Sequence, residues 1–187
     1  MKKLLVLFIL LPFFSFSQLG EYYYSKGHPK SKGLNFQIKK PVGFEQNEAD
    51  RPNIVQKWEK YKTDNSKYVA FMIIVKKMDE FSGVSRLDWE QYLKHEGGVR
   101  EMALAIPNAS NYKFFKIDNY PGMILDAEME FEQLDFSVKI YMTQITVFVE
   151  SYGFTFQLQS PSKSKRDENR RILYLMANSI LFPDQYK

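Results

Sequence analysis

Apolar and polar residues alternate over several stretches of this chain, and the alternation predicts strands. The segments 34–39 (LNFQIK) and 154–159 (FTFQLQ) place apolar residues at every second position, which is typical of a strand with one buried face. The segment 68–75 (YVAFMIIV) is almost wholly apolar, which favours a strand buried on both faces. Such a strand needs a layer on each side, so we expect a central sheet covered on both faces.

A long hairpin is predicted between residues 123 and 149, and its register follows from the pattern. From 126 to 132 acidic and apolar residues alternate. A two-residue connection at Leu134-Asp135 makes one face of the pair apolar throughout, whereas a shift by one residue would mix the two faces. This register places Phe131 in the core. The facing pairs are Phe131 with Val138, Met129 with Ile140, Ala127 with Met142, and Glu130 with Lys139.

Two other regions predict helices. Ser85 lies three residues before an aspartate, as at many helix starts, and Gly97-Gly98 should divide residues 85–106 into two short helices or a kinked one. Further on, Ser164 also precedes an aspartate by three residues. Apolar residues then recur at intervals of four, which indicates an amphipathic helix that ends at Pro183. The chain therefore combines a sheet with helices.

Three short motifs resemble those of a known family. The segment 36–44 (FQIKKPVGF) is similar to the opening strand and turn of PsbP-like and Mog1-like domains. The segment 117–122 (IDNYPG) resembles their turn into a long hairpin, and 178–182 (NSILF) resembles their closing helix end. The resemblance covers residues 34–182. It implies an α+β fold, an α/β/α sandwich with a central, mainly antiparallel sheet flanked by helices. It also implies accessory, assembly or binding roles, and it supplies no catalytic residue.

The first 17 residues (MKKLLVLFILLPFFSFS) have the layout of a secretory signal peptide. Two lysines precede an apolar run, and small residues stand at the −3 and −1 positions before Gln18. The run is short for a membrane span of about 20 residues, so we expect cleavage rather than an uncleaved anchor. The mature protein would then be periplasmic or extracellular. Residues 18–33 are expected to be an N-terminal tether, in which Tyr22, Tyr23 and Tyr24 could instead form a first short strand. Residues 34–187 are expected to be a single globular domain.

Composition and charge narrow the class of protein. The chain has no cysteine, so it forms no disulfide and carries no lipid-modified cysteine. Two of its 26 basic residues lie in the leader, which leaves 24 against 22 acidic residues. This near balance argues against nucleic-acid binding, which usually requires a strongly basic face.

The sequence contains no convincing catalytic, metal or cofactor motif. The two histidines are far apart, and His95-Glu96 lacks the second histidine of a zinc-protease motif. No Gly-x-Ser-x-Gly segment and no glycine-rich phosphate loop occur. We therefore predict no catalytic residue, no cofactor and no established metal site, and we expect the protein not to be an enzyme.

One acidic and one basic group remain as weaker candidates. The acidic row could attract a cation, although a flat strand face converges poorly on calcium, and we expect it to face solvent. Basic residues open the last helix, where they oppose the helix dipole, and pairing with the acidic row would explain both groups. The acidic row is Asp126, Glu128, Glu130 and Glu132, and the basic helix start is Lys163, Lys165, Arg166, Arg170 and Arg171.

Three functional hypotheses follow from these patterns. The first is an exported, non-catalytic protein that binds or helps to assemble another, unknown envelope protein, with possible peripheral association with the envelope. The second is a carrier with an apolar pocket between sheet and helix. The third is a hydrolase that uses Asp126 and Glu128. The candidate interaction residues are Tyr22, Tyr23, Tyr24, Lys165, Arg166 and Arg170.

Overall fold

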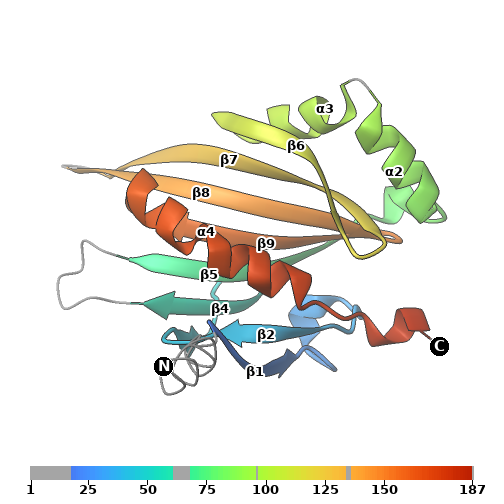
Figure 1. The fold of residues 1–187 in the computed structure, drawn as a ribbon, viewed down its shortest axis with the longest axis horizontal. Coiled ribbons are helices and arrows are strands. Elements are labelled where there is room, and N and C mark those ends of the chain that lie inside the picture. Colours follow the sequence, from blue (N-terminus) through green and yellow to red (C-terminus); the bar gives the residue numbers. More distant parts are fainter. Residues whose placement is uncertain (1–17, 61–67, 96, 134–135, 187) are drawn as a thin grey trace, which may run out of the picture.

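A computed structural model of the chain describes residues 18–60, 68–95, 97–133 and 136–186 (Figure 1). Within these residues seven strands form one sheet, in which every neighbouring pair is antiparallel. The sheet order is β3 (Glu45–Asn47), β4 (Ile54–Lys60), β5 (Val69–Lys77), β9 (Tyr152–Ser160), β8 (Phe136–Val149), β7 (Tyr120–Gln133) and β6 (Ala109–Ile117). A second, two-stranded sheet pairs β1 (Leu19–Tyr24) with β2 (Gln37–Pro41).

Helices lie on both faces of the large sheet, which confirms the expected α+β sandwich. On one face α4 (Lys163–Asn178) contacts β8 and β9, and β2 packs against the same helix. On the other face α2 (Arg86–Lys94) contacts β7 and β8, and α3 (Gly98–Leu104) contacts β6. Three short 3-10 helices complete the described elements: η2 (Pro29–Ser31), η3 (Asp79–Phe81) and η4 (Pro183–Tyr186).

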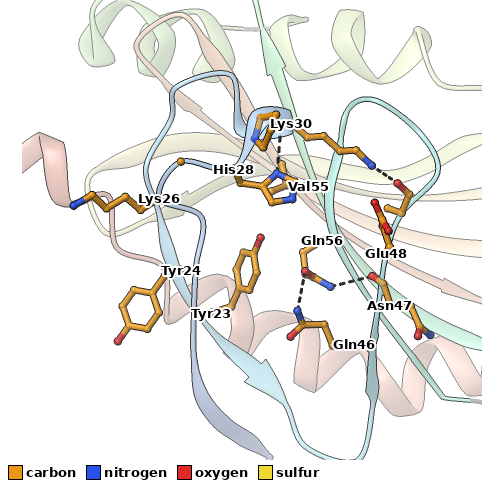
Figure 2. Close-up of a pocket in the computed structure, with 13 residues that line it drawn as sticks. Tyr23, Tyr24, Lys26, His28, Lys30, Gln46, Asn47, Glu48, Val55 and Gln56 are labelled. Carbon is orange, nitrogen blue, oxygen red and sulfur yellow. Dashed lines mark hydrogen bonds between the residues drawn. The ribbon is translucent and has the colours of Figure 1, made fainter.

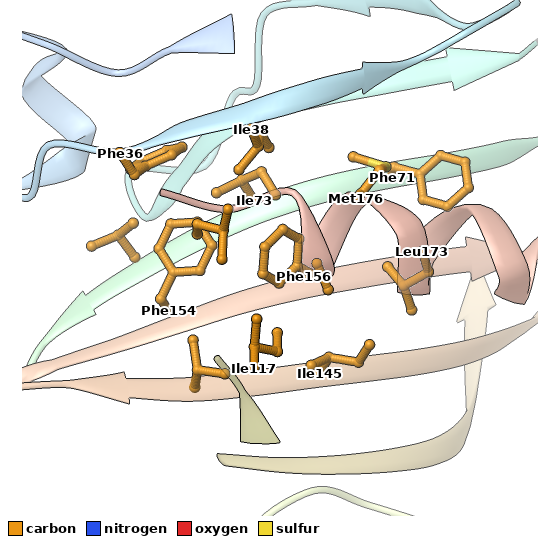
Figure 3. Packing of buried hydrophobic residues seen from close by; sticks show 14 of the residues in the cluster. Phe36, Ile38, Phe71, Ile73, Ile117, Ile145, Phe154, Phe156, Leu173 and Met176 are labelled. Atoms are coloured by element: carbon orange, nitrogen blue, oxygen red, sulfur yellow. The ribbon is translucent and has the colours of Figure 1, made fainter. Parts of the chain in front are cut away.

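The main core lies between the large sheet, α4 and β2. Aromatic and branched side chains from β5, β8 and β9 meet Leu173 and Met176 of α4 there (Figure 3). Phe36 joins this cluster from the segment before β2, with its ring centroid 4.7 Å from that of Phe154. Burial of this apolar surface is the principal driving force for the fold.

Local signals at the helix ends are confirmed in part. Ser85 caps α2 in a reciprocal capping box with Asp88, as the sequence predicts. The helix breaks before Gly97, which has a φ of +110°, a conformation that favours glycine. The expected start of α4 at Ser164 is wrong. Its cap is Ser162, which is extended and whose hydroxyl accepts a hydrogen bond from the Lys165 backbone.

The segment 18–33 is not a loose tether, which corrects the sequence-based expectation. Its first half forms β1, paired with β2. Ser25 is buried. Its hydroxyl accepts a hydrogen bond from the Phe36 backbone N–H at 2.8 Å and donates one to the Leu34 carbonyl at 3.2 Å. Pairing with β1 satisfies backbone groups of β2 that would otherwise lie at a sheet edge. We propose that the globular unit begins near residue 18 rather than at residue 34.

The register of the long hairpin is confirmed pair by pair, but one consequence drawn from it is wrong. Strand β6 ends opposite Ala127, and β9 ends opposite Tyr141. The described residues of β7 and β8 beyond these points form a two-stranded extension, residues 128–133 and 136–140, which we call the arm. Phe131 lies on this arm and is 43% exposed, because α2 and α3 cover the other end of that sheet face. It is therefore not a core residue.

The predicted signal peptide, residues 1–17, lies outside the described residues. Among the helices in the described part of the chain, none combines the length and the apolar character needed to cross a membrane.

Candidate binding site on the sheet face

Among the large apolar side chains described in the seven-stranded sheet, the most exposed lie on the arm. Phe131 and Val138 face each other across the two strands and are 43% and 42% exposed. Met129 and Ile140 form the next pair inward on the same face. The four side chains therefore make one continuous apolar surface, which we call the arm face.

The arm face continues into a groove of about 410 Å³ on the same side of the sheet. Met72 and Ile74 of β5 and Gln157 of β9 line the groove beside the arm. The loop before β4 forms another part of the lining, with Asp50 and Arg51. The groove thus combines an apolar interior with charged residues from the neighbouring loop, and we call it the arm groove.

Ion pairs and hydrogen bonds hold the β4 side of the groove in place. Glu59 is buried and lies 2.9 Å from the Lys57 ammonium. It also accepts hydrogen bonds from Asn47, at 2.7 Å, and from the Tyr68 hydroxyl. Lys57 and Tyr68 line the groove, so this network fixes two of its residues before any partner binds.

The acidic row lies on the opposite face of the sheet, under α4, and its first member is buried. Asp126 is only 2% exposed, which corrects the expectation that the whole row faces solvent. An Arg170 Nη2 donates to both of its carboxylate oxygens, at 2.9 and 2.8 Å. Thr143 and Asn111 donate to the same group at 2.7 and 3.0 Å, and an Arg166 nitrogen lies 3.7 Å away. Asp126 therefore anchors α4 to the sheet.

The next members of the row form more exposed pairs. Lys163 of α4 lies 2.6 Å from Glu128. Glu130 lies 3.8 Å from Lys139 and accepts a hydrogen bond from Ser137 at 2.7 Å. Glu132, at the end of the row, is exposed. The structure thus brings the acidic row and the basic helix start together, the pairing that the sequence suggested.

These contacts also decide what the carboxylates can do chemically. Burial acts to raise the pKa of Asp126, but hydrogen bonds from Thr143, Asn111 and Arg170 outweigh it and hold the pKa below its usual range. A general acid needs a raised pKa instead, so the geometry does not favour a hydrolase built on Asp126 and Glu128. Among the described residues, no three acidic or histidine side chains gather as metal ligands do.

The candidate interaction residues separate into structural and exposed groups. The Tyr23 ring packs edge-on against Trp58 with centroids 5.7 Å apart, and its burial raises its pKa. Arg166 is also buried, so its assignment to an interaction surface is corrected. Tyr24 is 61% exposed, and Lys165 is paired with a glutamate one turn along α4.

The remaining two of these candidates are held by contacts within the chain. The Lys39 ammonium lies 5.6 Å from the Tyr22 ring centroid. Arg170, as described above, holds Asp126 and also pairs with Asp167 at 3.0 Å. Each of these two side chains therefore has a partner within the chain.

A second, polar pocket of about 530 Å³ lies between the segment after β1 and strands β3 and β4 (Figure 2). Its amide side chains bond mainly to one another and to the backbone. Gln56 donates to the Asn47 carbonyl at 3.1 Å and accepts from Gln46 at 3.3 Å. Lys30 donates to the Ala49 carbonyl. The Lys30 bond fastens the segment after β1 to the β3–β4 connection, whereas the amide bonds join β3 to β4.

The sequence pattern identifies the residues of the arm face but predicts that they lie in the core. The alternation that identified them is the same for a covered and an uncovered sheet face. The groove residues from β4, β5 and β9 were not found, because they come from separate strands that only the folded sheet places together.

Comparisons with known proteins find similarity among solved structures. A scan against protein-family models finds no match, and a search of curated proteins finds none either. Among solved structures, the chain is similar to cyanobacterial PsbP (CyanoP) from Synechocystis, at 11% identity and a TM-score of 0.48, covering 90% of this chain and 95% of that one.

Two further solved structures are similar over comparable lengths. LpqN of Mycobacterium tuberculosis, described as involved in cell envelope biogenesis, is 10% identical with a TM-score of 0.48, covering 86% of this chain and 89% of that one. The Ran-binding protein Mog1p of Saccharomyces cerevisiae is 6% identical with a TM-score of 0.44. The alignment covers 88% of this chain and 96% of Mog1p. These similar structures include a PsbP protein and a Mog1 protein, the two groups whose motifs the sequence resembles.

Proposed function

We propose that this chain, whose fold is similar to PsbP-like and Mog1-like domains, is an exported, non-catalytic accessory protein that binds another envelope protein through the arm face and the arm groove. The observation that carries the proposal is the exposure of the facing pair Phe131 and Val138, at 43% and 42%. Single exposed apolar residues are common, but a continuous apolar face beside a groove marks an interaction surface more often.

The geometry of the arm supports a protein partner. The arm face is apolar, and charged residues of the groove such as Arg51 and Lys57 lie beside it. Protein interfaces commonly place an apolar centre inside a polar rim. The opposite face of the arm carries Glu128 and Glu130, whose charge discourages association on that side. A partner is therefore expected to cover the apolar face alone.

Export rests on the predicted leader and can be tested directly. We expect the intact mass of the protein purified from its native compartment to correspond to a chain that begins at Gln18. The physical reason is the small-residue cleavage site at residues 15–17. Mass spectrometry of the secreted or envelope fraction measures this. A mature species that retains residues 1–17 would contradict export with cleavage.

Site-specific photo-crosslinking tests the docking surface. We expect p-benzoylphenylalanine at position 131 to give a discrete adduct with one envelope protein after irradiation in vivo. The same probe at Leu104 of α3, which is 71% exposed, should not give that adduct. Leu104 is a matched control because it is also an exposed apolar residue, but on a different element.

Affinity measurements with the captured partner complete the test. Replacing both Phe131 and Val138 by serine should weaken binding about tenfold or more, since buried aromatic anchors dominate interface energies. Leu87→Ser, at a 63% exposed site on α2, should leave binding within about twofold of wild type, because most surface positions contribute little. Equal losses in both variants, or equal crosslinking from positions 131 and 104, would show that the arm is not the docking surface.

A further inference from the structure

A separate pocket lies beside α2. Figure 1 shows that α2 and the outer end of the arm strands β7 and β8 lie at opposite ends of the molecule. Its volume is about 350 Å³, at the lower end of the range for small-molecule sites. Lining residues come from η3, from the segment that follows it, and from α2 and α3. They include Phe81, Val84, Asp88, Trp89, Tyr92 and Met102, and we call the site the α2 pocket.

The aromatic part of the pocket is fixed without a ligand. Trp89 is 3% exposed and stacks on Phe148, with ring centroids 4.2 Å apart and planes 16° apart. Its indole nitrogen donates to the Glu150 carbonyl at 3.3 Å. The Phe81 ring lies 5.0 Å from that of Trp89. A ligand would therefore meet a preorganised aromatic surface, which reduces the entropic cost of binding.

The pocket also keeps exposed aromatic surface and one adaptable side chain. Phe81 is 38% exposed and Tyr92 is 40% exposed, although both line the pocket. Met102 contributes a flexible thioether, which adjusts to ligands of different shape. An apolar group in the pocket would thus remove aromatic surface from water that the chain itself leaves uncovered.

Asp88 supplies the charge at this site. One of its carboxylate oxygens accepts hydrogen bonds from the Ser85 backbone at 2.9 Å and from the Ser85 hydroxyl at 2.6 Å. These bonds hold the pKa of Asp88 below its usual range, so the group is ionised at neutral pH. Among the described residues that line the pocket, none is basic. The carboxylate would repel a fatty acid or another anion and attract a cation.

We propose that the α2 pocket binds a small molecule with an apolar body and a cationic head, such as a hydrophobic amine. The apolar body would lie against Trp89 and Met102, and the cation would lie near Asp88. Exposed aromatic rings such as Phe81 and Tyr92 also attract cations through their faces. This site differs in place from the pocket expected between sheet and helix, because the described residues that line it lie in η3, α2, α3 and their connections and not in strands. It does not rest on the proposed function of the arm.

Three phenyl-alkyl compounds that differ in head-group charge test the proposal by calorimetric titration of the mature protein. We expect 4-phenylbutylamine to bind about fivefold tighter than 5-phenylpentanoate at low salt, a ratio typical of one exposed charge pair. The neutral 4-phenylbutanol should bind with intermediate affinity. The ratio of the affinity for the amine to the affinity for the acid should decrease in 0.5 M sodium chloride, because salt screens exposed charges.

Three variants test whether the compounds bind in the α2 pocket, and one of them controls for a general effect of substitution. In Asp88→Asn the affinities for the amine and the acid should differ by no more than about twofold, as expected when one exposed charge is removed. Val84→Trp should fill the pocket and abolish binding of all three compounds, whereas Leu104→Trp outside it should change nothing. Melting temperatures show whether each variant is folded. Three outcomes would overturn the proposal. They are saturable binding of the acid with the same affinity as the amine, no saturable binding of the amine, and loss of binding only in Leu104→Trp.

Discussion

Replacing Asp126 by asparagine is expected to lower the free energy of unfolding by about 3 kcal/mol, since the change removes the buried carboxylate that faces Arg166 and Arg170 and leaves them only the more exposed Asp167 as an anionic partner. Asp126 is 2% exposed and lies within reach of both Arg166 and Arg170, whose side chains are 9% and 28% exposed. Asparagine has nearly the same shape but carries no charge. Urea denaturation at pH 7 measures the difference.

Glu128→Gln is the matched control for this prediction. Glu128 lies on the same strand and also pairs with α4, but its side chain is 34% exposed and that of Lys163 is 61% exposed. Exposed pairs contribute at most about 1 kcal/mol, so this variant should remain close to wild type. Equal losses in Asp126→Asn and Glu128→Gln would show that burial of Asp126 does not decide its contribution.

The effect of Asp126→Asn should also depend on pH. The pKa of Asp126 is lowered in the folded protein, so the ionised carboxylate stabilises the fold above the unfolded pKa of about 3.9. That contribution is lost as the pH falls through the lower, folded pKa. The difference in unfolding free energy between wild type and Asp126→Asn should therefore be largest at pH 6–7 and narrow below about pH 4. A difference that grows on acidification would contradict this assignment.

Gly122→Ala is expected to be the second severe substitution, with a loss of about 3 kcal/mol or more from overpacking. A Cβ atom at position 122 of β7 would lie 2.0 Å from the Thr146 carbonyl oxygen and 2.9 Å from the Val147 Cα. Both are backbone atoms of β8, the neighbouring strand, so no side chain can rotate away. Thermal and urea unfolding of the purified variant measure the loss.

Gly153→Ala provides the control, because Gly153 is also a buried strand glycine of the same sheet. A Cβ there would meet the end of the Met78 side chain at 3.7 Å, an ordinary contact. Alanine is favoured over glycine within strands, so this variant should be equal to wild type or more stable by up to about 1 kcal/mol. If Gly122→Ala were as stable as Gly153→Ala, the close approach of β7 and β8 would not explain the glycine at position 122.

Much of the architecture could be predicted because it depends on local pattern. The break at Gly97-Gly98 and the register of the β7–β8 hairpin were predicted correctly from spacing alone. The start of α4 was misplaced by two residues because Ser162 and Ser164 are both plausible caps. The segment 18–33 was misread because its glycines, lysines and proline resemble a linker, whereas its pairing partner β2 lies at a distance in the sequence.

The candidate sites were less predictable than the fold. The arm groove and the α2 pocket are assembled from separate elements, and neither has a sequence motif. The sequence identifies the acidic row, but it does not predict that Asp126 is buried while Glu132 is exposed. Those environments depend on which part of β7 lies beneath α4.

The sequence by itself determined which residues share a face of each strand and helix, since side-chain direction follows from periods of 2 and 3.6 residues. It thereby determined the sandwich and the apolar face of the hairpin. Only the tertiary structure decided which faces are covered. Helix α4 buries Asp126 on one side of β7, while α2 and α3 stop short of Phe131 on the other. The physical reason is that burial depends on where a packing partner from a distant segment ends, and periodicity carries no information on that position.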